Sequence, residues 1–113
     1  MKKKILLKHF YIIFKKCNKS FIYGCGSYLF DGKKYKYEQK MLEKQKLLYD
    51  LSKLNKKILE IGTYMGHSLL IMLMSNPKLN ITAVDIDKTY SLSAINYLRK
   101  KINNSKIKFF HND

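Results

Sequence analysis

Three short apolar runs, separated by two segments of helix length, constrain the fold of this chain more than any other feature. The runs are rich in β-branched and aromatic residues, which is typical of strands. They are KILEI (57–61), LNITAVDID (79–87) and KIKFFHND (106–113). Residues 67–76 and 88–103 between them have the apolar periodicity of helices. This order predicts an α/β fold of the Rossmann-like βαβαβ kind, in which three parallel strands are joined by right-handed crossovers.

Before the first strand, the sequence predicts two helices and a short hairpin. Residues 3–18 place apolar side chains at helical spacing and gather lysines on another face, and residues 36–54 carry a second apolar stripe that ends at Asn55. The segment FIYGCGSYLF (21–30) predicts two short aromatic strands around its glycines. We therefore divide the chain into a basic amphipathic segment, 1–36, and an α/β domain, 37–113.

Charge is concentrated in the N-terminal segment. The whole chain has a formal charge of +15, and residues 1–36 hold ten lysines against one aspartate. Such a segment favours an anionic membrane surface, an acidic partner or nucleic acid as the partner. However, Arg99 is the single arginine among 23 basic residues, whereas phosphate and base recognition favour the arginine fork. Compositional bias is therefore the preferred explanation of the charge, and a helix packed on the domain with its lysines in water is the preferred interpretation of residues 3–18.

The cysteines and the N-terminus favour a cytoplasmic protein. Cys17 and Cys25 have neither metal-binding nor redox spacing, so free thiols are a simpler interpretation than one disulfide. The start MKKKILLKHFYIIFKK resembles a signal peptide, but Lys8 and His9 interrupt its apolar stretch. That stretch is also too short and too charged to span a bilayer.

Carboxylates stand at or near the carboxyl ends of the predicted strands. A parallel βαβ unit binds its ligands outside these ends. Glu60 stands just before a turn, 62–66, that leads into a helix, and Asp85 and Asp113 end the next two strands. A carboxylate in an apolar run is costly to bury unless a cation or hydrogen-bond donors meet it. Glu60 therefore either faces water on an exposed edge strand or belongs to a site for a positive charge.

The glycine pattern excludes two phosphate-binding sites. A P-loop needs a Gly-Lys-Ser/Thr ending that the chain lacks, and a dinucleotide fingerprint needs glycines where Tyr64 and His67 stand. Glu60 would also repel a pyrophosphate. S-adenosylmethionine offers an α-ammonium for Glu60, a carboxylate for the turn amides and a ribose for Asp85.

The stretch ILEIGTYMGHSLL resembles motif I of Rossmann-like, S-adenosylmethionine-dependent methyltransferases, and it is most similar to the small-molecule O-methyltransferases of the catechol and caffeoyl-CoA type. The resemblance covers residues 38–113. It places Asp85 of AVDID at the ribose and Asp113 of KFFHND at the adenine, although Asn112 stands where glycine is usual. The residues that it implies for the methionine-binding motif are Glu60, Gly62, Thr63, Tyr64, Gly66 and Ser68.

The resemblance also implies parts that are not in this sequence. The family's sheet has seven strands, and its catalytic bases and metal-ligand carboxylates follow the third strand. We therefore expect a truncated form of the fold, assign neither a catalytic residue nor a metal site, and leave the small-molecule acceptor and the activity open. Strand 57–61 would then be an exposed edge, covered by residues 21–30, by a second copy or by a completing chain. The alternative function is a non-catalytic interaction module that uses the basic N-terminal helix at a membrane surface or an acidic partner.

Several residues near the motif have structural interpretations. Gly62 and Gly66 could serve only as turn glycines, and Asp85 as a loop cap. We predict Asp87 to be the N-cap of the following helix and His67 to be a solvent-facing spacer at a helix start. The methionines at 65, 72 and 74 are predicted to fill the core.

Overall fold

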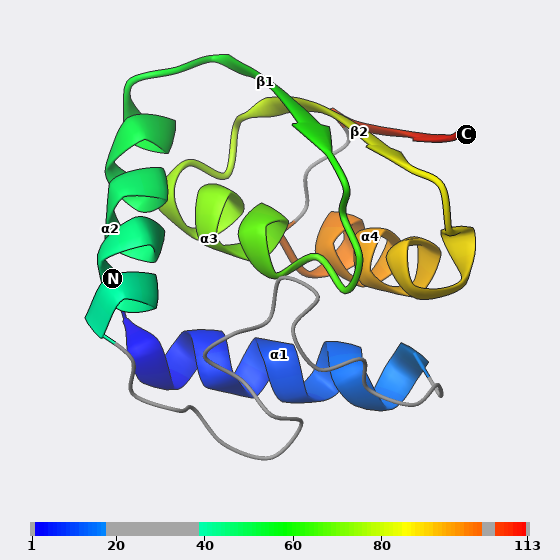
Figure 1. Ribbon diagram of the computed structural model, residues 1–113, viewed down its shortest axis with the longest axis horizontal. Coiled ribbons are helices and arrows are strands. Elements are labelled where there is room, and N and C mark those ends of the chain that lie inside the picture. Colours follow the sequence, from blue (N-terminus) through cyan, green and yellow to red (C-terminus); the bar gives the residue numbers. More distant parts are fainter. Residues whose placement is uncertain (1, 18–38, 103–105, 113) are drawn as a thin grey trace.

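The computed structural model describes residues 2–17, 39–102 and 106–112 (Figure 1). The predicted hairpin at 21–30 and the predicted site residue Asp113 lie outside these ranges. The elements are α1 (Lys3–Cys17), α2 (Gln39–Lys53), β1 (Lys57–Ile61), α3 (His67–Ser75), β2 (Asn80–Asp85), α4 (Lys88–Ile102) and β3 (Ile107–His111). Both helices predicted before the first strand, and the βαβαβ order after them, are thus confirmed.

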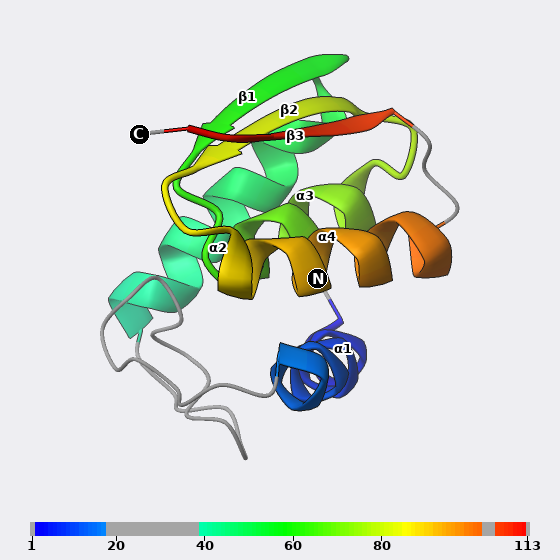
Figure 2. The ribbon, with the colours of Figure 1, turned by 90° about the vertical axis from the view of Figure 1, so that its right-hand side faces the viewer.

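The three strands form one parallel sheet in the order β1-β2-β3. In its register Glu60 lies beside Ala83, and Asp85 lies beside His111. The crossover helices α3 and α4 both lie on one face of this sheet, as Figure 2 shows. The predicted α/β half-sheet is confirmed, with β1 at an edge of the described sheet.

Helix α3 is the centre of the hydrophobic core. Residues 69–74 are all apolar, and residues 69–73 each expose 2% or less of their surface. The sheet covers this helix on one side, while α2 and α1 pack against it from others. Burial on every side explains why its sequence lacks the polar stripe of a surface helix. Met65 and Met72 are buried here, as predicted for core methionines.

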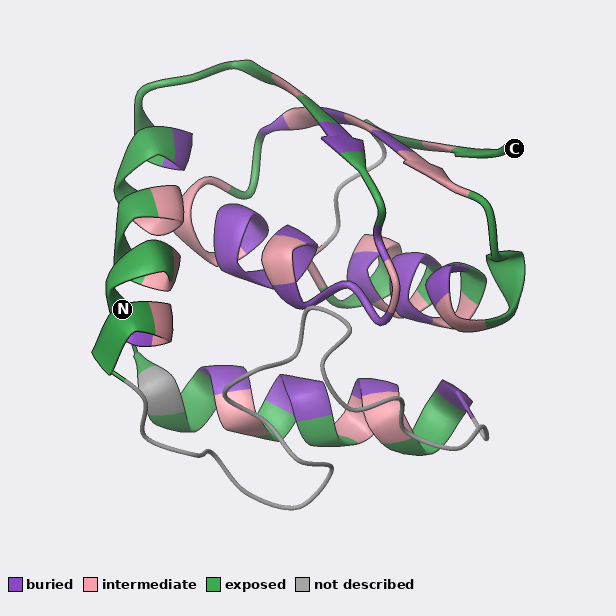
Figure 3. Ribbon diagram, in the orientation of Figure 1, coloured by how far each residue is buried: buried purple, intermediate pink, exposed green. Residues whose placement is uncertain are grey.

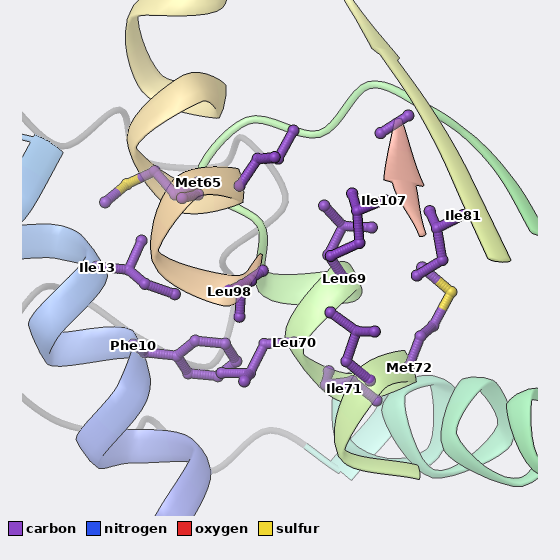
Figure 4. Packing of buried hydrophobic residues seen from close by; sticks show 14 of the residues in the cluster. Phe10, Ile13, Met65, Leu69, Leu70, Ile71, Met72, Ile81, Leu98 and Ile107 are labelled. Atoms are coloured by element: carbon purple, nitrogen blue, oxygen red, sulfur yellow. The ribbon is translucent and has the colours of Figure 1, made fainter. Parts of the chain in front are cut away.

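Helix α1 uses its apolar face inside the fold. Leu6, Phe10, Ile13 and Cys17 are buried against α4 and α3 (Figures 3 and 4). The lysines at 4, 8, 15 and 16 of this helix are exposed. Because the apolar face is already covered, the packed interpretation of this helix agrees with the structure better than one lying on a membrane. In the part of the chain that the structure describes, no helix has the length and hydropathy needed to cross a bilayer.

Hydrogen bonds hold α2 beside α3. The Asn55 amide donates to the carbonyl of Leu51 at 2.7 Å and closes the last turn of α2, as its predicted end requires. The hydroxyl of Ser75, at the end of α3, donates to the carbonyl of Tyr49. These contacts fix the start of β1, and therefore the position of the turn that follows it.

The opposite face of the sheet is uncovered in the described residues and exposes large apolar side chains beside polar ones such as Lys57 and Lys108. Leu59 is 64% exposed, Ile61 81% and Phe110 54%. Alternation along each strand puts these side chains on the face away from α3 and α4. All-parallel sheets normally have both faces covered, whereas the described helices cover one face of this sheet.

Candidate functional site

The turn between β1 and α3 has an unusual backbone. Gly62, Tyr64 and Gly66 all have positive φ angles, of 86°, 49° and 74°. The left-handed region strongly favours glycine, so the two glycines are required by the turn itself. A Cβ on Gly66 would also lie 3.0 Å from the Cβ of Ala94, because the turn presses against α4. The glycines therefore have the structural role that was an alternative for them, and they shape the wall of a cavity.

Asp85, at the end of β2, anchors this turn. Its Oδ2 accepts hydrogen bonds from the backbone N–H of Thr63 at 2.8 Å and of Tyr64 at 2.7 Å, and from the Ser91 hydroxyl at 2.9 Å. Its Oδ1 accepts from the N–H of Asp87 at 2.9 Å. Burial raises the pKa of Asp85, but these hydrogen bonds outweigh it and hold the pKa below its usual value. Asp85 is therefore a carboxylate that already occupies two of the turn amides.

Glu60 is buried, at 9% exposure, on the helix-facing side of β1. Its Oε2 accepts a hydrogen bond from the Thr63 hydroxyl at 3.1 Å, and its Oε1 accepts one from the Ser68 hydroxyl. The interpretation of Glu60 as a solvated edge residue is wrong, because the strand's alternation points residue 60 toward α3 rather than toward the uncovered face.

Burial raises the pKa of Glu60 to about 7. The hydrogen bonds from Ser68 and Thr63 oppose this rise, and the charge on Asp85 adds to it. No lysine or arginine of the described residues forms an ion pair with Glu60. The carboxyl group is therefore shared between its neutral and charged forms at neutral pH, and a cation beside it would stabilise the charged form.

A cavity of about 520 Å³ lies between the turn, the start of α3 and the end of β2. It brings together Gly62, Thr63, Tyr64, Ser68 and Asp85 from the predicted set. Glu60 lies behind the wall formed by Thr63 and Ser68, and Gly66 faces α4. In the residues that the structure describes, no group of three or more His, Cys, Asp or Glu could hold a metal ion.

Five residues that line this cavity were not among the predicted site residues, namely Met65, His67, Ile86, Asp87 and Tyr90. Tyr90 and Ile86 both line it, and the Tyr90 ring lies 4.9 Å from that of Tyr64, centre to centre. Both stand within five residues of Asp85, at the strand end and the first turn of α4. Large side chains directly after a strand-terminal carboxylate were the signal that could have identified them.

The prediction for His67 was wrong. His67 is 5% exposed, and its ring lies 4.2 Å from that of Phe10. Helix α1 covers this end of α3, a contact between residues far apart in the sequence that local pattern does not reveal. Asp87, by contrast, accepts a hydrogen bond from the N–H of Thr89 at 2.7 Å, which confirms it as the N-cap of α4.

Comparison with known proteins agrees with this geometry. Residues 31–113 match the family model described as O-methyltransferase, which covers the sheet, the turn and the cavity. A search of the curated proteins finds no match. Most of the chain is thus matched, and the described part of it has the three parallel strands and the strand-to-helix turn of a Rossmann-like methyltransferase's N-terminal half. The chain belongs to the O-methyltransferase family.

Proposed function

We propose that the cavity beside Asp85 binds S-adenosylmethionine, and that the chain serves methyl transfer to a small-molecule hydroxyl. The observation that carries the proposal is Glu60, a buried carboxyl group directly behind Thr63 and Ser68 of the cavity wall, which forms no ion pair within the described residues and whose pKa burial raises to about 7. The α-ammonium of S-adenosylmethionine would supply that partner. Family members generally use this cofactor, which supports the same assignment.

The cavity offers each part of the cofactor a matching group. Asp85, charged and at the cavity rim, would accept hydrogen bonds from the ribose hydroxyls. Ile86 is 70% exposed there and would cover one face of the adenine. The cofactor's carboxylate would lie at Ser68 and the N-terminal end of α3, because Asp85 already occupies the amides of Thr63 and Tyr64. Asp113 remains a prediction for the adenine.

Methyl transfer requires little acid–base catalysis at the methyl donor. The methyl group moves from the sulfonium sulfur to the acceptor oxygen, the sulfur leaves as a neutral thioether, and the acceptor's proton must go to a base. The enzyme therefore has to orient the acceptor and remove that proton. We assign the described residues to cofactor binding and none of them to this base.

We also propose that further polypeptide, from a second copy or a completing chain, covers β1. Among the described strands, β1 pairs with β2 alone, and the exposed Leu59 and Ile61 lie on the same strand. An edge strand with apolar side chains favours pairing with another strand. A strand added at this edge would lie next to Glu60 and the cavity, where an acceptor site would have to form.

Calorimetric titration of S-adenosylmethionine and S-adenosylhomocysteine into the full chain tests the cofactor proposal. Micromolar binding, about −8 kcal/mol, would support it if Glu60→Gln and Asp85→Asn weaken the binding. Asp50→Asn is the matched control, because Asp50 is an exposed carboxylate on α2. Absence of binding to the folded chain, or equal weakening in the control, would reject the proposal.

A further inference from the structure

A second cleft lies between α1 and α4, away from the cofactor cavity. The two helices pack together, and one contact is a hydrogen bond of 2.8 Å between Nδ1 of His9 and the hydroxyl of Tyr97. The cleft has a volume of about 760 Å³ and shares no lining residue with the cofactor cavity. Its lining consists of Lys16 from α1 and of Ser93, Asn96, Tyr97, Lys100 and Lys101 from α4.

The lining of this cleft is cationic, and none of its lining residues is acidic. Neither α1 nor α4 carries an acidic residue anywhere along its length. Lys16, Lys100 and Lys101 form no ion pair with any residue that the structure describes. Three like charges around one hollow repel one another, and an anion between them would relieve that repulsion.

The cleft also offers neutral hydrogen-bond donors. The side chains of Ser93 and Asn96 make no hydrogen bond within the described residues, and both line the hollow. The lysine charges also affect His9, which lies in the contact between α1 and α4. There the pKa of His9 is lowered first by burial and then by the charges of Lys101 and Lys8. His9 is therefore neutral in the contact, and the lysines carry the cleft's charge.

We propose that this cleft is a binding site for a phosphate group, carried by a phosphorylated small molecule. The lysine ammonium groups would pair with the charge, while the Asn96 amide and the Ser93 hydroxyl would donate to the remaining oxygens. Lysine lacks the planar fork of arginine, but it binds phosphate as a point charge, and three ammonium groups around one cleft can offset the charge of a dianion. The site is independent of the cofactor cavity and of the proposed methyl transfer.

Pyrophosphate is the probe, titrated into the full chain at low salt and followed by calorimetry and by ¹H–¹⁵N spectra. Binding should shift the Asn96 side-chain amide signals, and it should weaken about tenfold or more when the cleft loses its charges, because each contact is charge-assisted. The variant for this is the triple substitution Lys16→Gln, Lys100→Gln and Lys101→Gln, at exposed positions where folding is not at risk.

The matched control removes the same net charge elsewhere, with Lys40→Gln, Lys46→Gln and Lys78→Gln at exposed positions. Asn96→Asp, compared with Lys46→Gln alone, provides a second pair with equal net charge. The site is supported if the cleft variant of each pair loses more affinity for pyrophosphate than its control does. Equal loss within either pair, or no binding of pyrophosphate at all, overturns it.

Vesicles distinguish a soluble phosphate from a lipid headgroup. Vesicles of phosphatidylcholine with phosphatidic acid carry the same phosphate chemistry on a surface. Binding of pyrophosphate that the cleft variant loses, without vesicle binding that depends on the cleft, supports the proposal. Vesicle binding that the cleft variant also loses overturns the small-molecule ligand and assigns the cleft to a lipid headgroup. Binding to vesicles alone, unchanged in the cleft variant, overturns the site itself and assigns the exposed lysines of α1 to a membrane surface.

Discussion

Gly66 and Ala94 approach so closely that another carbon atom between the turn and α4 would require one of them to move. A Cβ on Gly66 would lie 3.0 Å from the Ala94 Cβ and 3.4 Å from Leu98 Cδ1, whereas one on Gly62 would meet nothing within 4 Å. Both glycines have positive φ, but a Cβ would be crowded only at Gly66. Comparing substitutions at the two positions therefore separates the cost of backbone strain from the cost of crowding. The close approach of Gly66 and Ala94 fixes how far the cavity wall stands from α4.

Gly62→Ala and Gly66→Ala should consequently differ in stability. Gly62→Ala should lower the free energy of unfolding by about 1 kcal/mol through its left-handed backbone alone. Gly66→Ala adds overpacking against Ala94 and should lower it by about 2 to 4 kcal/mol. Urea unfolding of both variants measures this difference. Equal losses would show that the turn can move away from α4 freely.

Glu60 should make the chain less stable as the pH rises from about 4.5 to about 7. Its folded pKa of about 7 lies above the unfolded value of 4.5, so the folded state binds more protons between these pH values. Stability therefore falls as pH rises from 4.5 to 7, by about 3 kcal/mol, and levels off above that. Urea unfolding at pH 5 and pH 8 measures the fall. Glu60→Gln, which stays neutral, should remove most of it, and an unchanged fall would contradict the role of Glu60.

Binding of S-adenosylmethionine should release a proton from Glu60. The cationic ammonium favours the charged carboxylate, so affinity should rise several-fold between pH 6 and pH 7.5 as Glu60, with its pKa of about 7, ionises. Calorimetry in two buffers of different ionisation enthalpy counts the proton. Glu60→Gln should bind more weakly and release none from this position. If the affinity of the wild-type chain does not change between pH 6 and pH 7.5, Glu60 does not interact with the cofactor.

Asp85→Asn should loosen the turn even without ligand. One oxygen can still accept from Thr63 and Tyr64, but the amide's NH₂ group then faces the N–H of Asp87, donor against donor. The expected loss is about 1 to 3 kcal/mol of unfolding free energy. Asp50→Asn, at an exposed position on α2, should change stability by about 0.5 kcal/mol or less. Amide exchange at Thr63 and Tyr64 should quicken in Asp85→Asn, and unchanged exchange there would contradict the anchoring role.

Ile61→Lys should reduce self-association without unfolding the chain. Ile61 is 81% exposed on the uncovered face, so the substitution removes little buried area and should change stability by about 0.5 kcal/mol or less. Light scattering on a size-exclusion column measures the state of association. Lys57→Gln, on the same strand, is a control that keeps both apolar side chains. A wild-type chain that is monomeric at all concentrations would reject the second-copy form of the edge proposal.

The sequence was sufficient for the helices and strands that the structure describes and for the placement of Glu60 and Asp85 near one turn. Parallel strands end at the same edge, so Glu60 and Asp85 had to meet near the turn once the strand–helix order was recognised. The burial of His67 could not be predicted, because Phe10 reaches it from a helix more than fifty residues earlier. The Asp85 carboxylate accepts hydrogen bonds from the backbone N–H groups of Thr63 and Tyr64. The pattern of strand residues does not specify these side-chain contacts.

The cavity is local in sequence, and this has a consequence for how the chain folds. Its lining residues all lie between Gly62 and Tyr90, and the anchoring hydrogen bond from Thr63 to Asp85 spans 22 residues. Contacts of short sequence separation form early, because little loop-closure entropy opposes them. At about 5 to 20 residues per second, a ribosome makes this stretch within seconds. The segment that forms the pocket is therefore continuous in sequence, and its anchor can close without any residue of β3.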